Sequence, residues 1–94
     1  MLIINGTAEL MRDDNELTLG TRHEFNMFSK EVPFEQQLTK IEEYLMSRGW
    51  DNIEILSNGI VSDVKEITHE ILQQAYDKAT SEGFAVAINN RSIN

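Results

Sequence analysis

The two histidines, His23 and His69, are the residues of this chain best suited to general acid–base chemistry near neutral pH. His23 falls on the apolar side of an alternating segment, where a partly buried imidazole with one hydrogen bond is the expected structural role. His69 falls in the first turn of a predicted helix and is expected to face solvent. Because the histidines are far apart in sequence, a shared metal site with Glu24 or Glu70 has no support from spacing. An enzyme that uses His23 with Glu24 or Arg22 is therefore the least favoured functional hypothesis.

Acidic residues gather in two places where they could bind a cation or transfer a proton. The segment Asp13-Asp14-Asn15-Glu16 concentrates oxygen ligands, but it lacks the alternating ligands, central glycine and distal glutamate of an EF-hand. We therefore interpret it as a solvated turn. Glu42 and Glu43 are adjacent on a predicted helix, so their side chains point about 100° apart. With Asp51 and Glu54 they form an expected solvated face, not a catalytic carboxylate pair.

Known catalytic and cofactor-binding motifs are missing from the sequence. No phosphate-binding loop, dinucleotide fingerprint, H-E-x-x-H or G-x-S-x-G motif is present, and the chain has no cysteine. We therefore expect no cofactor and no metal ion. Trp50 and Tyr44 are large enough to form a binding platform, but the position of Trp50 after Gly49 favours packing against the preceding helix.

The charge balance limits the classes of partner. The chain carries 16 acidic and 8 basic residues, and its net charge is −8. The basic residues are dispersed, so we expect no binding to nucleic acid and none to a membrane. A basic protein could instead be attracted, which makes an acidic inhibitor or nucleic-acid mimic the second functional hypothesis. The missing cysteines and the absence of a signal-peptide pattern at the start favour a cytoplasmic location.

The elements that would hold these residues follow from hydrophobic periodicity. Residues 2–11 and 16–28 alternate as two strands around a polar turn, which predicts an antiparallel hairpin. Pro33 is placed at a first helical position, and an apolar stripe predicts a helix over 33–48 that ends at Gly49. A strand is expected over 51–57.

The second half of the chain leaves one alternative open. Asn58-Gly59 predicts a tight hairpin and a short strand from Ile60. A helix then begins at Val64 through a capping box of Asp63 and Glu66, or after Thr68 with Ile67 and Leu72 as a hydrophobic staple. Residues 60–66 are therefore either strand or helix start. The helix ends at Gly83, residues 84–88 form the last strand, and 89–94 are expected to be a frayed tail.

Together these elements predict one α+β domain over residues 1–94, with the order β-β-α-β-(β)-α-β. The expected sheet is mixed and mostly antiparallel, and both helices pack on one of its faces. After the first strand this order is ferredoxin-like, a fold that hosts many functions. The predicted core is Leu17, Phe25, Phe34, Leu38, Ile41, Leu45, Ile53, Ile55, Ile71, Leu72, Val86 and Ile88.

A sheet covered on one face only leaves the other face for partners. The leading hypothesis is thus a small non-enzymatic interaction or regulatory module that binds a protein, and the expected partner is a second copy in a homodimer. In that dimer Arg22 of one subunit would meet Glu24 or Glu54 of the other. The predicted interaction surface is Arg22, Glu24, Asn26, Phe28, Glu54 and Leu56.

Overall fold

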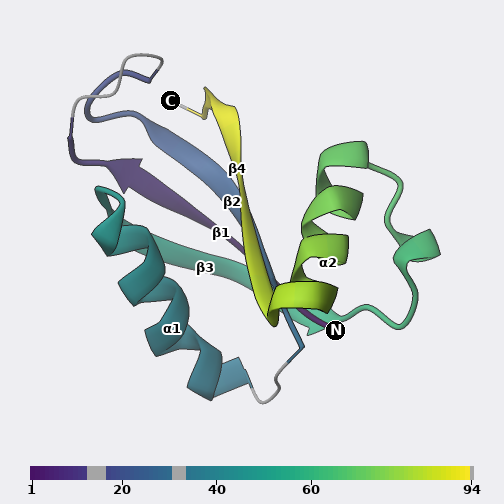
Figure 1. Cartoon of the computed structure of the whole chain (residues 1–94). Helices are drawn as coiled ribbons and strands as arrows, with labels where there is room; N and C mark the ends of the chain where they lie inside the picture. Colours follow the sequence, from purple (N-terminus) through teal and green to yellow (C-terminus); the bar gives the residue numbers. More distant parts are fainter. Residues whose placement is uncertain (13–16, 31–33, 94) are drawn as a thin grey trace.

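The structure is a computed structural model that describes residues 1–12, 17–30 and 34–93. It confirms the α+β class, with one sheet and two α-helices (Figure 1). None of the helices in the described part of the chain is long and apolar enough to cross a membrane. The elements are β1 (Leu2–Leu10), β2 (Arg22–Ser29), α1 (Phe34–Ser47), β3 (Trp50–Ile60), a 3₁₀ turn (Val64–Glu66), α2 (Glu70–Glu82) and β4 (Phe84–Ser92).

The sheet has the strand order β3-β1-β2-β4, and each neighbouring pair is antiparallel. β1 and β2 form the predicted N-terminal hairpin, although β2 begins at Arg22 and not near residue 16. The central strands β1 and β2 are buried along most of their length, whereas β3 and β4 are the two edges. A further strand could therefore pair with this sheet at β3 or at β4.

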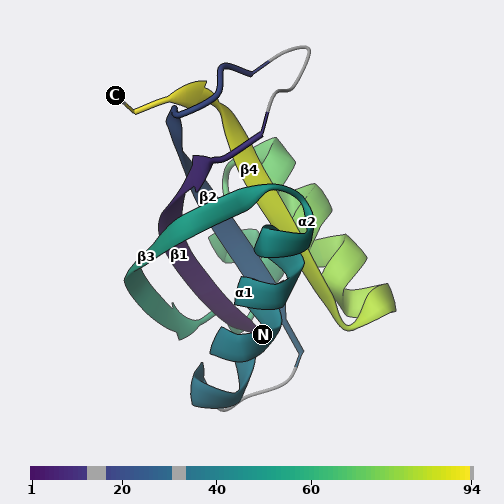
Figure 2. The same ribbon diagram turned by 90° about the vertical axis from the view of Figure 1, so that its left-hand side faces the viewer.

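The helices cover opposite faces of the sheet, so their predicted placement on one face is wrong (Figure 2). Ile41 and Leu45 of α1 pack on the face that contains Met27. Ala75 and Ala79 of α2 pack on the face that contains Phe28. Successive side chains of a strand point to opposite faces, and both Met27 and Phe28 are 0% exposed. Because β2 buries side chains on both of its faces, a helix must cover each face of the sheet.

The predicted hairpin at Asn58-Gly59 does not form. Both residues lie inside β3, opposite Ile4 and Ile3 of β1. The long pairing with β1 satisfies the backbone there, so tertiary pairing overrides the turn preference of Asn-Gly. After β3 the chain makes only the 3₁₀ turn in place of the bracketed strand, and the ferredoxin-like order is not confirmed.

The helix ends agree with the sequence signals at their C-termini. Gly49 follows α1 with φ +86°, and Gly83 follows α2 with φ +99°, conformations that glycine adopts without steric cost. Neither of the two alternatives for the start of α2 holds in full. Asp63 caps the 3₁₀ turn by accepting a hydrogen bond from the Lys65 amide, while α2 itself begins after His69.

Three remaining expectations concern the loops and the end of the chain. The acidic segment 13–16 and Pro33 lie outside the described residues. Residues 89–92 are not a frayed tail, because β4 continues to Ser92. Hydrogen bonds hold this end: the Asn89 carbonyl accepts from His23 Nδ1, and the Ile93 amide donates to the Arg22 carbonyl.

Candidate functional site

His23 is a buried structural residue in this fold. Its side chain is enclosed at 2% exposure, and its ring meets the Trp50 ring edge-on at a centroid distance of 5.3 Å. Nδ1 lies 2.7 Å from the Asn89 carbonyl oxygen, and because a carbonyl only accepts, Nδ1 is the donor. Nε2 lies 2.8 Å from Thr21 Oγ1. With both nitrogens engaged and no open surface on the ring, the geometry gives the catalytic hypothesis no support.

Arg22 connects three strands on the face that α2 only partly covers. Its Nε donates to Thr7 Oγ1 at 2.7 Å on β1, and its Nη2 donates to the Asn52 carbonyl on β3. Nη2 also lies 3.8 Å from a Glu54 carboxylate oxygen. Asn52 has φ +48°, in the left-handed region that few residues other than glycine adopt. Arg22 therefore bonds to β3 where the backbone of this edge strand is irregular. Its ion-pair partner belongs to the same chain, where a second subunit was expected.

The predicted interaction surface is therefore divided by the fold. Arg22 and Glu54 pair with each other, whereas Glu24 and Asn26 line a groove described below. Phe28 is wrongly assigned to the open surface, because it is fully buried beneath α2 with its ring against Tyr76. Leu56 is exposed, but it lies on β3, across the sheet from the groove.

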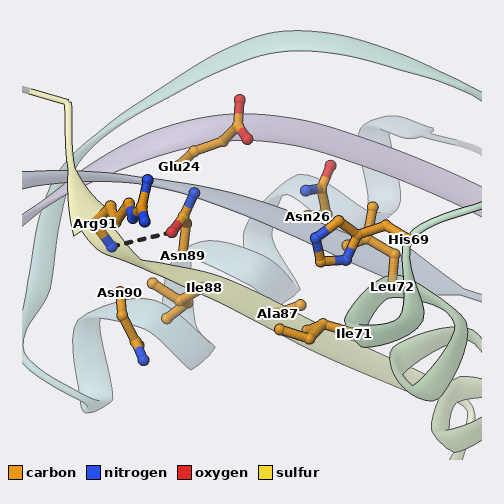
Figure 3. A pocket seen from close by; sticks show the side chains of 10 residues that line it. All are labelled: Glu24, Asn26, His69, Ile71, Leu72, Ala87, Ile88, Asn89, Asn90 and Arg91. Atoms are coloured by element: carbon orange, nitrogen blue, oxygen red, sulfur yellow. Dashed lines mark hydrogen bonds between the residues drawn. The ribbon is translucent and has the colours of Figure 1, made fainter.

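A groove of about 390 Å³ opens between the start of α2 and the second half of β4 (Figure 3). Its volume lies near the lower end of the range for small-molecule pockets. One end is apolar and formed mainly by Ile71, Leu72 and Ala87, whereas Glu24 and Arg91 bring opposite charges to the other end. The complete lining is Glu24, Asn26, His69, Ile71, Leu72, Ala87, Ile88, Asn89, Asn90 and Arg91.

The sequence-based predictions miss two segments of this groove. Ile71 was expected in the core but is 58% exposed. Its neighbour Leu72 packs on the α2 side of the core, and adjacent helical side chains point about 100° apart, so one of the pair had to turn outward. The adjacency of Ile71 and Leu72 was therefore a sequence signal that one of the two side chains is exposed. Residues 89–91 carried no such signal, because a polar run at the end of a chain resembles a frayed tail.

The free edge of β4 lies beside this groove. The Lys30 amide donates to the Gly83 carbonyl at 2.9 Å, which sets the alternation of hydrogen-bonded pairs along the ladder. It follows that Ala85 and Ala87 direct their backbone groups toward β2. The backbone groups of Phe84, Val86 and Ile88 point away from the sheet, and nothing in the described part of the chain pairs with them.

The opposite edge is less suited to pairing. The β1–β3 ladder shifts register between Asn5 and Gly6 and again between Thr7 and Glu9, which places irregularities in β3 near Leu56 and Asn52. Such bulges twist an edge away from a potential partner strand. The β2–β4 ladder, in contrast, runs without a register shift from Phe84 to Ile88. The regular open edge of the sheet is thus on β4.

Across 1–12, 17–30 and 34–93, no group of three or more His, Cys, Asp or Glu side chains could hold a metal ion. Comparison of the chain with models of known families, with curated proteins and with solved structures finds no match.

Proposed function

We propose that this chain is a non-enzymatic interaction module that binds an extended segment of a protein partner along β4. The observation that carries the proposal is the regular edge at Phe84, Val86 and Ile88, whose backbone groups point outward beside a half-apolar groove. An added strand would pair with these groups, and its alternate side chains would reach the groove. Backbone pairing supplies affinity in this mode, while the groove selects among sequences.

The composition of the groove favours a partner segment of mixed character over a purely basic one. Ile71 and Leu72 offer apolar contacts, while Glu24 and Arg91 carry opposite charges. No continuous acidic surface lines this site, so the acidic-mimic hypothesis rests on net charge alone. The cytoplasmic location belongs to the proposal as well, and its support is the lack of cysteine.

The test is selection from a library of random peptides displayed on phage, followed by mapping of the recovered peptides on the ¹⁵N-labelled chain. We expect the bound peptide to shift the amide signals of β4 and of the first turn of α2. Ile71→Glu should weaken binding, whereas Met46→Glu should leave it unchanged. Met46 is a matched control, because it lies on α1 and is 56% exposed, against 58% for Ile71. Failure to recover any peptide, or amide shifts confined to other elements, would contradict the proposal.

A further inference from the structure

From the shape of the β4 edge we infer that its occupant is β4 of a second copy of this chain. The inference rests on the proposed function and names its partner. Two copies would pair their β4 strands antiparallel about a two-fold axis, so that one sheet continues across both subunits. The axis would pass beside Val86, with Phe84 of each copy opposite Ile88 of the other.

The first argument is that the hydrogen-bonding edge is symmetric about Val86. The outward backbone groups belong to Phe84, Val86 and Ile88, so the antiparallel register pairs all of them with the same groups of the second copy. The edge is also bounded on both sides. On one side Gly83, with φ +99°, separates β4 from the end of α2, and on the other side the β2–β4 register shifts beyond Ile88. A second copy has the same length of regular edge, whereas a long partner strand would extend past both bends.

The second argument concerns charge. The chain has a net charge of −8, so most approaches of two copies bring like charges together. Residues 84–88 read Phe-Ala-Val-Ala-Ile and contain no charge, and the three larger side chains among them are half-buried, on the α1 face. The stretch itself contains neither lysine nor proline, the residues that commonly protect an edge strand against pairing. The nearest cation given by the structure is the Lys40 ammonium, which lies 4.7 Å from the centre of the Phe84 ring.

The third argument is complementarity at the ends of the paired strands. The register brings Arg91 of one copy level with the Ser81–Glu82 end of α2 in the other copy. Both groups lie on the α2 side of the sheet, because Arg91 lines the groove and Glu82 ends α2. Among the described residues, the ion pair of Glu82 is with Lys78, at 3.9 Å and with both side chains more than half exposed. A basic and an acidic group would therefore meet at each end of the interface.

The experiment is size-exclusion chromatography with light scattering from micromolar to millimolar concentration, on the wild type, four single variants and one double variant. The wild type should shift from one chain to two. Val86→Pro should prevent the shift, since proline removes an N–H that points outward and is tolerated on the open side of an edge strand. Leu56→Lys on the other edge is the control and should still dimerise. Circular dichroism checks that each variant folds.

Charge reversal keeps the inference testable if Val86→Pro fails to fold. Arg91→Glu and Glu82→Arg should each weaken the dimer about fivefold, and the double variant should recover the wild-type affinity. A wild type that stays at the mass of one chain overturns the inference. If that monomer still binds displayed peptides at β4, the proposed function stands. A dimer that Leu56→Lys abolishes and Val86→Pro leaves intact moves the interface to β3 and overturns the inference, whereas peptide binding at β4 still decides the proposed function.

Discussion

Replacing Phe28 with alanine tests whether the sheet is buried on both faces. Phe28 is 0% exposed, and its ring lies 6.0 Å from the Tyr76 ring of α2 at an interplanar angle of 71°. Truncating a fully buried phenylalanine costs about 3–5 kcal/mol in the free energy of unfolding. Of that loss, the edge-to-face ring pair accounts for about 0.5–1.5 kcal/mol. A residue on an open sheet face would lose only about 0.5 kcal/mol.

The assay is urea unfolding followed by circular dichroism, with the slope of the transition compared between variants. Ile71→Ala is the control on α2 and should change the free energy of unfolding by less than about 1 kcal/mol, because the side chain is mostly exposed. Tyr76→Leu should lose the ring pair while keeping apolar contact. If Phe28→Ala proves too unstable to measure, Phe28→Leu should show a smaller loss in the same direction. A loss below about 1 kcal/mol in Phe28→Ala would refute the packing of α2 on this face.

Three further outcomes follow from the fold and the charge. Gly6→Ala should destabilise the chain by about 1–3 kcal/mol in the same unfolding assay, because a Cβ at Gly6 would lie 2.7 Å from Phe25 Cζ and against the Glu54 carbonyl; an unchanged midpoint would show that β1 and β3 are further apart. Zinc and calcium should leave the melting temperature unchanged, and a large rise that His23→Ala or Asp13→Ala abolishes would show a metal site. Binding to DNA or RNA at physiological salt should be negligible by fluorescence anisotropy, since the net charge is −8, and a salt-sensitive submicromolar complex would contradict this.

Local sequence signals predicted the elements better than their assembly. The alternation of residues 2–10 and the apolar stripe of α1 each arise within one element, and Gly49 and Gly83 end their helices for a local conformational reason. The placement of α2 is a different kind of property. An amphipathic pattern shows that a helix buries one of its sides. The pattern does not show which face of the sheet that side packs against.

The same limit explains what could be foreseen of the candidate site. Glu24 and Asn26 were expected on a partner-binding surface because both lie on the polar side of an alternating strand, and they do line the groove. Phe28 follows the same alternation, yet α2 covers it, since cover depends on a distant segment. The free edge of β4 depends on strand order, because among the strands of the described residues β4 pairs with β2 alone. Periodicity within one strand carries no information about that order.

Backbone amide exchange along β4, measured residue by residue by NMR, is the most direct test of β4 as the binding edge. At low protein concentration we predict fast exchange at Phe84, Val86 and Ile88, and slow exchange at Ala85 and Ala87, whose amides bond to β2. At high concentration, or with a selected peptide bound, the first set should become as protected as the second. Equal protection of both sets at every concentration, with no change on peptide binding, would contradict an open edge at β4.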